Sequence, residues 1–173
     1  MILAIGGAGC NIAEAIKEKA SDKRLRDASF VFLDTDAQHL SKFEGGNNRI
    51  IRLKDESNAI PVELLRKVGS LIIVAGLGGS TTHKYLPEAV KVASSASVSD
   101  ISIIATTPFF FEGEDRITKA TETVSIIQNL GNVRINLINN EDLVTRFPEL
   151  NFMNAFELAD NSAMEFIETI FIQ

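Results

Sequence analysis

The chain has 173 residues, of which 45% are hydrophobic and 23% are charged, and its formal net charge is −6. This composition is typical of a globular domain that buries most of the surface its unfolded form exposes, and it excludes a disordered chain. We therefore expect a single domain over residues 1–173. Lys and Arg are spread along the sequence instead of clustered, which argues against nucleic-acid binding.

The single cysteine, Cys10, excludes an intrachain disulfide, and we expect it to be a small packing residue. The sequence shows neither a signal peptide nor an apolar run long enough to span a membrane. We therefore expect a cytoplasmic protein without a membrane span.

Apolar runs of strand length alternate with amphipathic stretches along the chain. In chain order they predict a strand at Ile2–Ile5, a helix at Ile12–Ala20, strands at Phe30–Leu33 and Arg49–Leu53, a short helix around Val62–Val68, a strand at Leu71–Ala75, a helix at Thr81–Ser95, a strand at Ile101–Ala105, a helix at Asp115–Leu130, a strand at Ile135–Ile138, a short helix at Glu141–Arg146 and a helix at Met153–Ile170. Strands that are apolar on both faces suit burial between two helical layers. The predicted fold class is α/β, with a doubly wound, mainly parallel, Rossmann-like sheet and helices on both faces.

Ligands of open α/β sheets bind at the carboxyl ends of the strands, so the residues after each strand are the candidates for a site. These segments read GGAGCN (6–11), DTDAQ (34–38), GLGGSTT (76–82), TTPFFFEGEDR (106–116) and NNED (139–142). Two of them are rich in glycine and lead into a helix N-terminus, where free N–H groups and the helix dipole favour an anion. The pattern predicts a phosphate site, with simple strand-capping turns as the alternative. The hydroxyls of Ser80, Thr81 and Thr82 suit either phosphate donors or helix caps.

The last predicted helix places a carboxylate on its apolar side. Its apolar stripe consists of Phe156, Ala159, Ala163, Phe166, Ile167 and Ile170. Asp160 falls inside this arc, and a buried charge needs a partner. The N1–H and N2–H donors of guanine fit a carboxylate, and Phe156 lies one turn earlier, where it can stack on a base. An Asp at the helix margin that bonds to water or a neighbouring amide is the alternative.

This set of segments, in this order, resembles the nucleotide-binding domain of the tubulin/FtsZ family of GTPases. GGAGCN is similar to the first glycine loop of the family, DTDAQ to its Asn-Thr-Asp-Ala-Gln segment, and AGLGGSTT to its signature loop G-G-G-T-G-T-G. TTPFFFEGEDR resembles FtsZ's Thr-Lys-Pro-Phe followed by Phe-Glu-Gly and Arg, and INNEDL resembles its Ile-Pro-Asn-Asp-Arg-Leu. NAFELADNSAMEFIETI looks like the start of the long central helix. The resemblance runs from Ile2 to about Ile170.

The resemblance implies a site for GTP or GDP, with Mg²⁺ as an accompanying ion. It places Gly7, Ala8, Gly9, Cys10 and Asn11 near the phosphates, and Gly78, Gly79, Ser80 and Thr81 in the signature loop. It also implies that Thr106 and Pro108 line the sugar, that Glu112 meets the ribose hydroxyls, that Arg116 lies towards the phosphates, and that Asn140, Phe156 and Asp160 hold the guanine. No catalytic residue and no protein-held metal ion are assigned.

The chain also departs from the family pattern. Ser80 stands at the third glycine of the signature loop, and Thr82 and Lys84 stand at its later glycines. The region 43–59 lacks the glycine-rich loop that senses the terminal phosphate in FtsZ. The sequence ends at Gln173, inside the central helix, before the family's acidic loop and second domain. We therefore expect guanine-nucleotide binding with slow or no hydrolysis by this chain alone, in connection with filament or cell-division machinery.

Two other functions stay open. GGAGCNI is close to the G-x-G-x-x-G/A fingerprint of NAD(P)-binding domains, and Asp34 lies 25 residues after Gly9, near the spacing of a ribose-binding acid. Asp34 and Asp36 also suit a metal-bound water or a cap for the next helix. The other alternative is a non-enzymatic interaction module with a degenerate pocket.

The C-terminal segment MEFIETIFIQ (164–173) is rich in apolar residues that spread around the predicted helix. A large exposed apolar patch is unusual on a soluble monomer. The segment therefore predicts a homo-oligomer or a protein partner that docks on this helix, with a frayed end as the alternative.

Overall fold

The structure is a computed structural model, and it describes residues 1–53, 60–147, 149–151 and 154–171. In these residues six parallel strands form one sheet, in the order β3-β2-β1-β4-β5-β6. The strands are β1 (Ile2–Ile5), β2 (Phe30–Asp34), β3 (Arg49–Arg52), β4 (Ser70–Gly76), β5 (Asp100–Thr107) and β6 (Arg134–Asn139). The doubly wound parallel sheet is confirmed, and the chain order reverses between β1 and β4.

The carboxyl ends of the central strands are level with one another. Ile5 is the register partner of both Leu33 and Ala75, and Gly76 is the partner of Thr106. The segments that follow these strands therefore leave the sheet side by side, at the edge where open α/β sheets bind their ligands.

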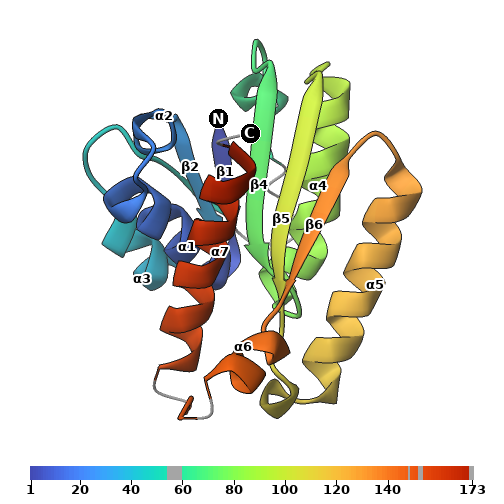
Figure 1. The fold of residues 1–173 in the computed structure, drawn as a ribbon. Coiled ribbons are helices and arrows are strands. Elements are labelled where there is room, and N and C mark those ends of the chain that lie inside the picture. The colour runs from blue at the N-terminus through green and yellow to red at the C-terminus, as the bar shows by residue number, and fades with distance from the viewer. Residues whose placement is uncertain (54–59, 148, 152–153, 172–173) are drawn as a thin grey trace.

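Helices cover both faces of the sheet (Figure 1). One face carries α1 (Gly6–Lys19) and α7 (Ala155–Phe171), and the other carries α4 (Ser80–Ser95) and α5 (Glu114–Leu130). Side chains alternate along a strand, so Leu3 and Ile5 of β1 join one apolar core while Ile2 and Ala4 join the other. The shorter elements are α2 (Lys23–Arg26), α3 (Ala37–Leu40), α6 (Glu141–Arg146) and the 3₁₀ turns η1 (Ser41–Phe43), η2 (Val62–Leu64) and η3 (Phe110–Glu112).

Two helix boundaries differ from the sequence prediction. Helix α1 begins at Gly6 instead of Ile12, so the first glycine segment is itself the first turns of the helix. The helix expected at Val62–Val68 is only one 3₁₀ turn, because Lys67 adopts a left-handed φ of 67° through which a right-handed helix cannot continue. The predicted start of the last helix, Met153, lies outside the described residues.

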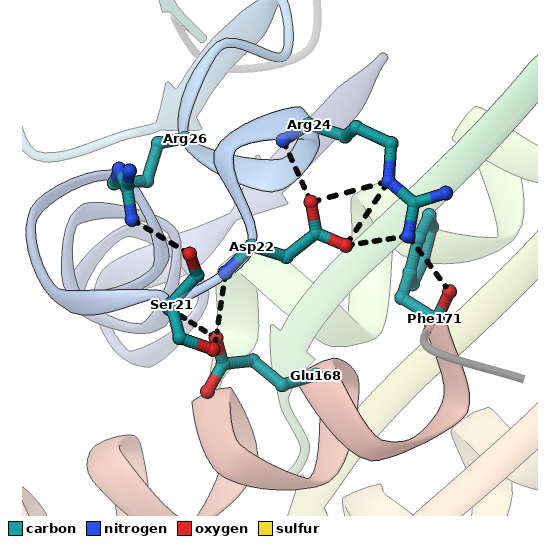
Figure 2. Close-up of polar contacts among 6 residues, drawn as sticks. All are labelled: Ser21, Asp22, Arg24, Arg26, Glu168 and Phe171. Atoms are coloured by element: carbon teal, nitrogen blue, oxygen red, sulfur yellow. Dashed lines mark hydrogen bonds and ion pairs between the residues drawn. The ribbon is translucent and has the colours of Figure 1, made fainter.

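Polar contacts attach the C-terminal half of α7 to the connection between α1 and α2 (Figure 2). The Glu168 carboxylate accepts hydrogen bonds from the Ser21 backbone N–H, from the Ser21 hydroxyl at 2.8 Å and from the Asp22 N–H at 3.3 Å. Arg24 pairs with Asp22 at 2.6 Å and donates to the Phe171 carbonyl oxygen at 3.5 Å. This end of α7 is therefore fixed by both backbone and side-chain contacts.

The apolar residues near the end of α7 are less exposed than the sequence suggested. Met164 and Ile167 are buried, while Phe166, Ile170 and Phe171 are half-buried against the same core. None of the described residues from 164 to 171 is an exposed large hydrophobic residue, so the exposed patch expected here is not found in this part of the helix. A partner on α7 stays a prediction. None of the described helices combines the length and hydropathy needed to cross a membrane.

Candidate functional site

A cavity of about 350 Å³ lies at the carboxyl edge of the sheet, where the chain order reverses. Its volume is in the range of small-molecule sites. Segments that follow β1, β4, β5 and β6 form its walls together with the start of α7. The predicted site residues that line it are Gly7, Ala8, Asn11, Gly79, Ser80, Thr81, Thr106, Pro108, Glu112, Arg116, Asn140, Phe156 and Asp160.

Six further residues line the cavity, and of these only Thr82 was considered from the sequence as a possible ligand contact. They are Gly6, Gly76, Leu77, Thr82, Thr107 and Ala159. Each of them lies inside or directly beside a segment that the sequence did single out. The sequence therefore predicts which segments form the cavity. Which residues of a segment line the cavity depends on the exact path of the backbone.

Three predicted phosphate-side residues do not line the cavity. A Cβ atom on Gly9 would lie 2.4 Å from the Val74 carbonyl oxygen, so this glycine lets α1 pack closely on β4. Gly78 has a φ of 88°, and a Cβ atom there would lie 2.7 Å from the Arg116 carbonyl oxygen. Cys10 is fully buried in the core, and burial raises the pKa of its thiol to about 12. These residues support the cavity from behind.

Two helix N-termini meet at the phosphate side of the cavity. The first turns of α1 and α4 both line it, and neither helix start is capped by a side chain. The first N–H groups of a helix have no partner within the helix, and the dipole makes this end positive. Arg116 lines the same cavity with a side chain that is about half exposed. This side of the cavity is built to receive an anion.

The hydroxyl groups of Ser80, Thr81 and Thr82, in the second glycine-rich segment (76–82), have different surroundings. The Thr81 hydroxyl lies 3.2 Å from an Asp34 carboxylate oxygen and 2.9 Å from the Thr35 hydroxyl, and the Thr82 hydroxyl donates to the Ile5 carbonyl oxygen at 3.4 Å. Ser80 is exposed and lines the cavity. Of the three hydroxyls, Ser80 is therefore the one best placed to meet a ligand.

Glu112 is occupied by protein groups. One of its carboxylate oxygens accepts the Phe109 N–H at 2.8 Å, and the other lies 2.7 Å from the Arg116 guanidinium. In this arrangement Glu112 holds Arg116 at the cavity wall. A ribose contact by Glu112 stays a prediction.

The same cavity is also lined by two residues with acceptor groups, Asn140 and Asp160, and by the aromatic ring of Phe156. Asn140 is only 4% exposed, and its Oδ1 has no hydrogen-bond partner among the described residues. Burial raises the pKa of Asp160 to about 7, against the lowering effect of a hydrogen bond from Asn11, while the nearby charge of Glu157 raises it further. Phe156 is 47% exposed. An orphaned buried oxygen is costly, so a ligand that donates hydrogen bonds here would be stabilised.

Asp34 is not available as a ribose-binding acid. It is 5% exposed, does not line the cavity, and accepts hydrogen bonds from the Thr35 N–H at 2.7 Å and from Thr81. The strand order is nevertheless the one of dinucleotide-binding folds. The fold alone therefore does not separate the two nucleotide hypotheses, but the position of Asp34 counts against NAD(P). Asp36 has the capping role considered from the sequence, because its side chain accepts from the N–H groups of Gln38 and His39 at the start of α3.

Comparison with known proteins finds relatives among cell-division proteins, although no family profile matches the chain. FtsZ of Porphyromonas gingivalis is 26% identical over 181 residues, which cover 93% of this chain and 38% of that protein. FtsZ of Haloferax mediterranei is 26% identical over 188 residues, which cover 98% of this chain and 48% of that protein. The chain therefore spans less than half the length of these relatives.

Solved structures show the same fold. An empty FtsZ dimer from M. jannaschii matches with a TM-score of 0.81 and 21% identity, over 96% of this chain and 52% of that chain. CetZ2 from Haloferax volcanii, in a GTPγS-bound protofilament, matches with a TM-score of 0.78 and 13% identity, over 98% of this chain and 57% of that chain. Sequence similarity to FtsZ over nearly the whole chain and the shared fold together confirm the resemblance to the tubulin/FtsZ family.

Proposed function

We propose that the chain binds a guanine nucleotide, GTP or GDP, in the cavity at the carboxyl edge of the sheet. The observation that carries this proposal is the pair of acceptors at one side, the unpaired Asn140 Oδ1 and the Asp160 carboxylate. Guanine offers N1–H and N2–H donors along one edge, and these match two acceptors. Adenine has a bare N1 at the corresponding position, which would face the carboxylate without a hydrogen between them.

The other side of the cavity supports a phosphate chain. The uncapped N-termini of α1 and α4 supply N–H donors, and Arg116 supplies a positive charge. Mg²⁺ binds nucleotide phosphates and keeps several waters. If it accompanies the nucleotide, the exposed Ser80 hydroxyl is the oxygen that this chain would offer to it. The proposal covers binding and assigns no catalytic residue.

Titration of the purified chain with fluorescent analogues of GTP, ATP and NAD tests the proposal. We expect the tightest binding for the guanine nucleotide. Asp160→Ala should weaken it by about 1.5–3 kcal/mol, or roughly tenfold to a hundredfold, because a charged hydrogen-bond partner is lost. Glu165→Ala is the matched control, since Glu165 is an exposed acid on the same helix that does not line the cavity.

The same titration separates the alternatives. Equal affinity for GTP and ATP would contradict guanine selectivity, and preferential binding of NAD would support the dinucleotide-binding alternative. Binding of none of the three would support an interaction module with a degenerate pocket.

We also propose that the partner of this chain is a second copy of itself, in a cytoplasmic filament or cell-division assembly. This rests on the family, since the structures of relatives include an FtsZ dimer and a CetZ2 protofilament. Light scattering over a range of protein concentrations, with and without GTP, provides the test. A mass that stays at one chain in every condition would contradict self-association.

A further inference from the structure

Three side chains that can bind a metal ion meet behind the cavity wall, and each comes from a different element. Cys10 lies on α1, Asp34 ends β2, and His39 lies on α3. One potential ligand atom from each, a sulphur, a carboxylate oxygen and a ring nitrogen, lies within 4.8 Å of the other two. Cys10 and Asp34 are buried, and the His39 side chain is 17% exposed. This is therefore a buried mixed set of N, O and S donors, not a surface cluster of acids.

The hydrogen bonds around His39 determine which ring nitrogen is free. The Asn11 Oδ1 lies 3.2 Å from His39 Nε2. An amide oxygen can only accept a hydrogen bond. Nε2 then carries the hydrogen, and in the neutral ring Nδ1 holds a lone pair. Metal-bound histidines commonly donate their second N–H to an oxygen in this way.

The free nitrogen faces a free carboxylate oxygen. His39 Nδ1 is buried, has no hydrogen-bond partner among the described residues, and lies 3.3 Å from Asp34 Oδ2. The other oxygen, Oδ1, already accepts from Thr35 and Thr81. Two acceptor atoms at this distance repel each other unless a proton or a metal ion lies between them. Zinc bonds to nitrogen and oxygen of about 2.0–2.2 Å at a tetrahedral angle separate the two ligand atoms by about 3.3–3.5 Å.

We propose that Cys10, Asp34 and His39 form a binding site for a transition-metal ion of the zinc type. The thiolate, one carboxylate oxygen and Nδ1 are the three protein ligands, and solvent supplies the fourth. A sulphur, nitrogen and oxygen donor set favours zinc over Mg²⁺ or Ca²⁺. At zinc bond lengths the sulphur lies about 3.5 Å from the other two ligand atoms, so it has to move closer to them by at most about 1.3 Å. The site lies outside the nucleotide cavity and does not depend on the proposed function.

Spectroscopic titration of the chelator-treated full chain with Co²⁺, without nucleotide, tests this site. Co²⁺ replaces zinc in such sites, and bound thiolate gives a sulphur-to-cobalt charge-transfer band that oxygen ligands do not give. We expect about one equivalent to bind, with the intense visible bands of tetrahedral cobalt, and Zn²⁺ to abolish the spectrum by competition. Cys10→Ser should remove the charge-transfer band. Asp34→Asn and His39→Gln should each weaken binding roughly tenfold or more.

Two controls keep the test decisive. His83→Gln changes the other histidine of the chain, which lies outside the group, and it should leave cobalt binding unchanged. Far-UV circular dichroism reports whether each variant folds, and the wild-type spectrum decides the question even if Cys10→Ser does not fold. A wild-type chain without the charge-transfer band overturns the proposal, and so does a folded Cys10→Ser variant that keeps it. Either result would assign His39 and Asp34 to a simple imidazolium–carboxylate pair.

Discussion

The Arg116 guanidinium lies 2.7 Å from the Glu112 carboxylate, and Glu112 uses its other oxygen to accept the Phe109 N–H at 2.8 Å. Glu112 is nearly buried while Arg116 is about half exposed. The bond from the Phe109 N–H therefore fixes Glu112 at the 3₁₀ turn, and Glu112 in turn holds the Arg116 guanidinium at the cavity wall. This geometry holds the guanidinium at the wall of the cavity that the first turns of α1 and α4 also line.

Arg116→Ala should weaken binding of GTP and GDP roughly tenfold or more and change the affinity for guanosine little, because the lost charge acts on phosphate. Lys119→Ala is the matched control. Lys119 forms an i,i+4 pair of the same length, 2.7 Å, with Asp115 on the same helix but does not line the cavity. Equal losses for the two variants, or an equal loss for guanosine and GTP, would contradict a phosphate contact by Arg116.

The affinity for guanine nucleotide should fall as the pH is lowered from 8 to 6. The pKa of Asp160 is raised to about 7 by burial, and only the ionised carboxylate has both oxygens free to accept a hydrogen bond from guanine. If only that form binds, the apparent dissociation constant rises about tenfold over this range. Fluorescence titrations at several pH values measure it. In Asp160→Asn the dependence should disappear, and its persistence there would assign the titration to another group.

The same carboxyl should make the nucleotide-free chain less stable as the pH rises from about 4 to 7. Asp160 ionises near 3.8 in the unfolded chain and near 7 in the folded one. Between these values the folded chain binds more protons, so the free energy of unfolding decreases with increasing pH. At pH 8 the penalty is on the order of 4 kcal/mol, and Asp160→Asn should remove most of it. Urea denaturation at pH 5 and pH 8 measures the difference, with Glu165→Gln, an exposed acid on the same helix, as control. An unchanged difference between wild type and Asp160→Asn at the two pH values would contradict the shifted pKa.

The fold could be predicted from the sequence because its strands are apolar on both faces and each is followed by a helical pattern or a turn segment. The position of Asp160 within an apolar arc was equally readable, and its raised pKa agrees with burial on that side of α7. The role of Gly9 was not readable, because its contact with Val74 depends on how closely α1 approaches β4. The proximity of His39 to Cys10 and Asp34 could not be predicted from the sequence, because the three residues belong to different elements that come together only when the sheet forms.

Removal of the Glu168 carboxylate should destabilise the attachment of α7. This group accepts from the N–H and hydroxyl of Ser21 and from the Asp22 N–H, and these bonds lower its pKa. Glu168→Ala should lower the free energy of unfolding by about 0.5–1.5 kcal/mol, the net value of hydrogen bonds near solvent, and not more, because solvent screens the charge. Since the folded-state pKa is lowered, the contribution is present above the unfolded pKa and is lost as the pH falls below it. Urea denaturation at neutral and acidic pH measures both effects, with Glu165→Ala, an exposed acid on the same helix, as control. Equal destabilisation by the two substitutions would show that the contacts of Glu168 with Ser21 and Asp22 add nothing to the stability that the apolar packing of α7 provides.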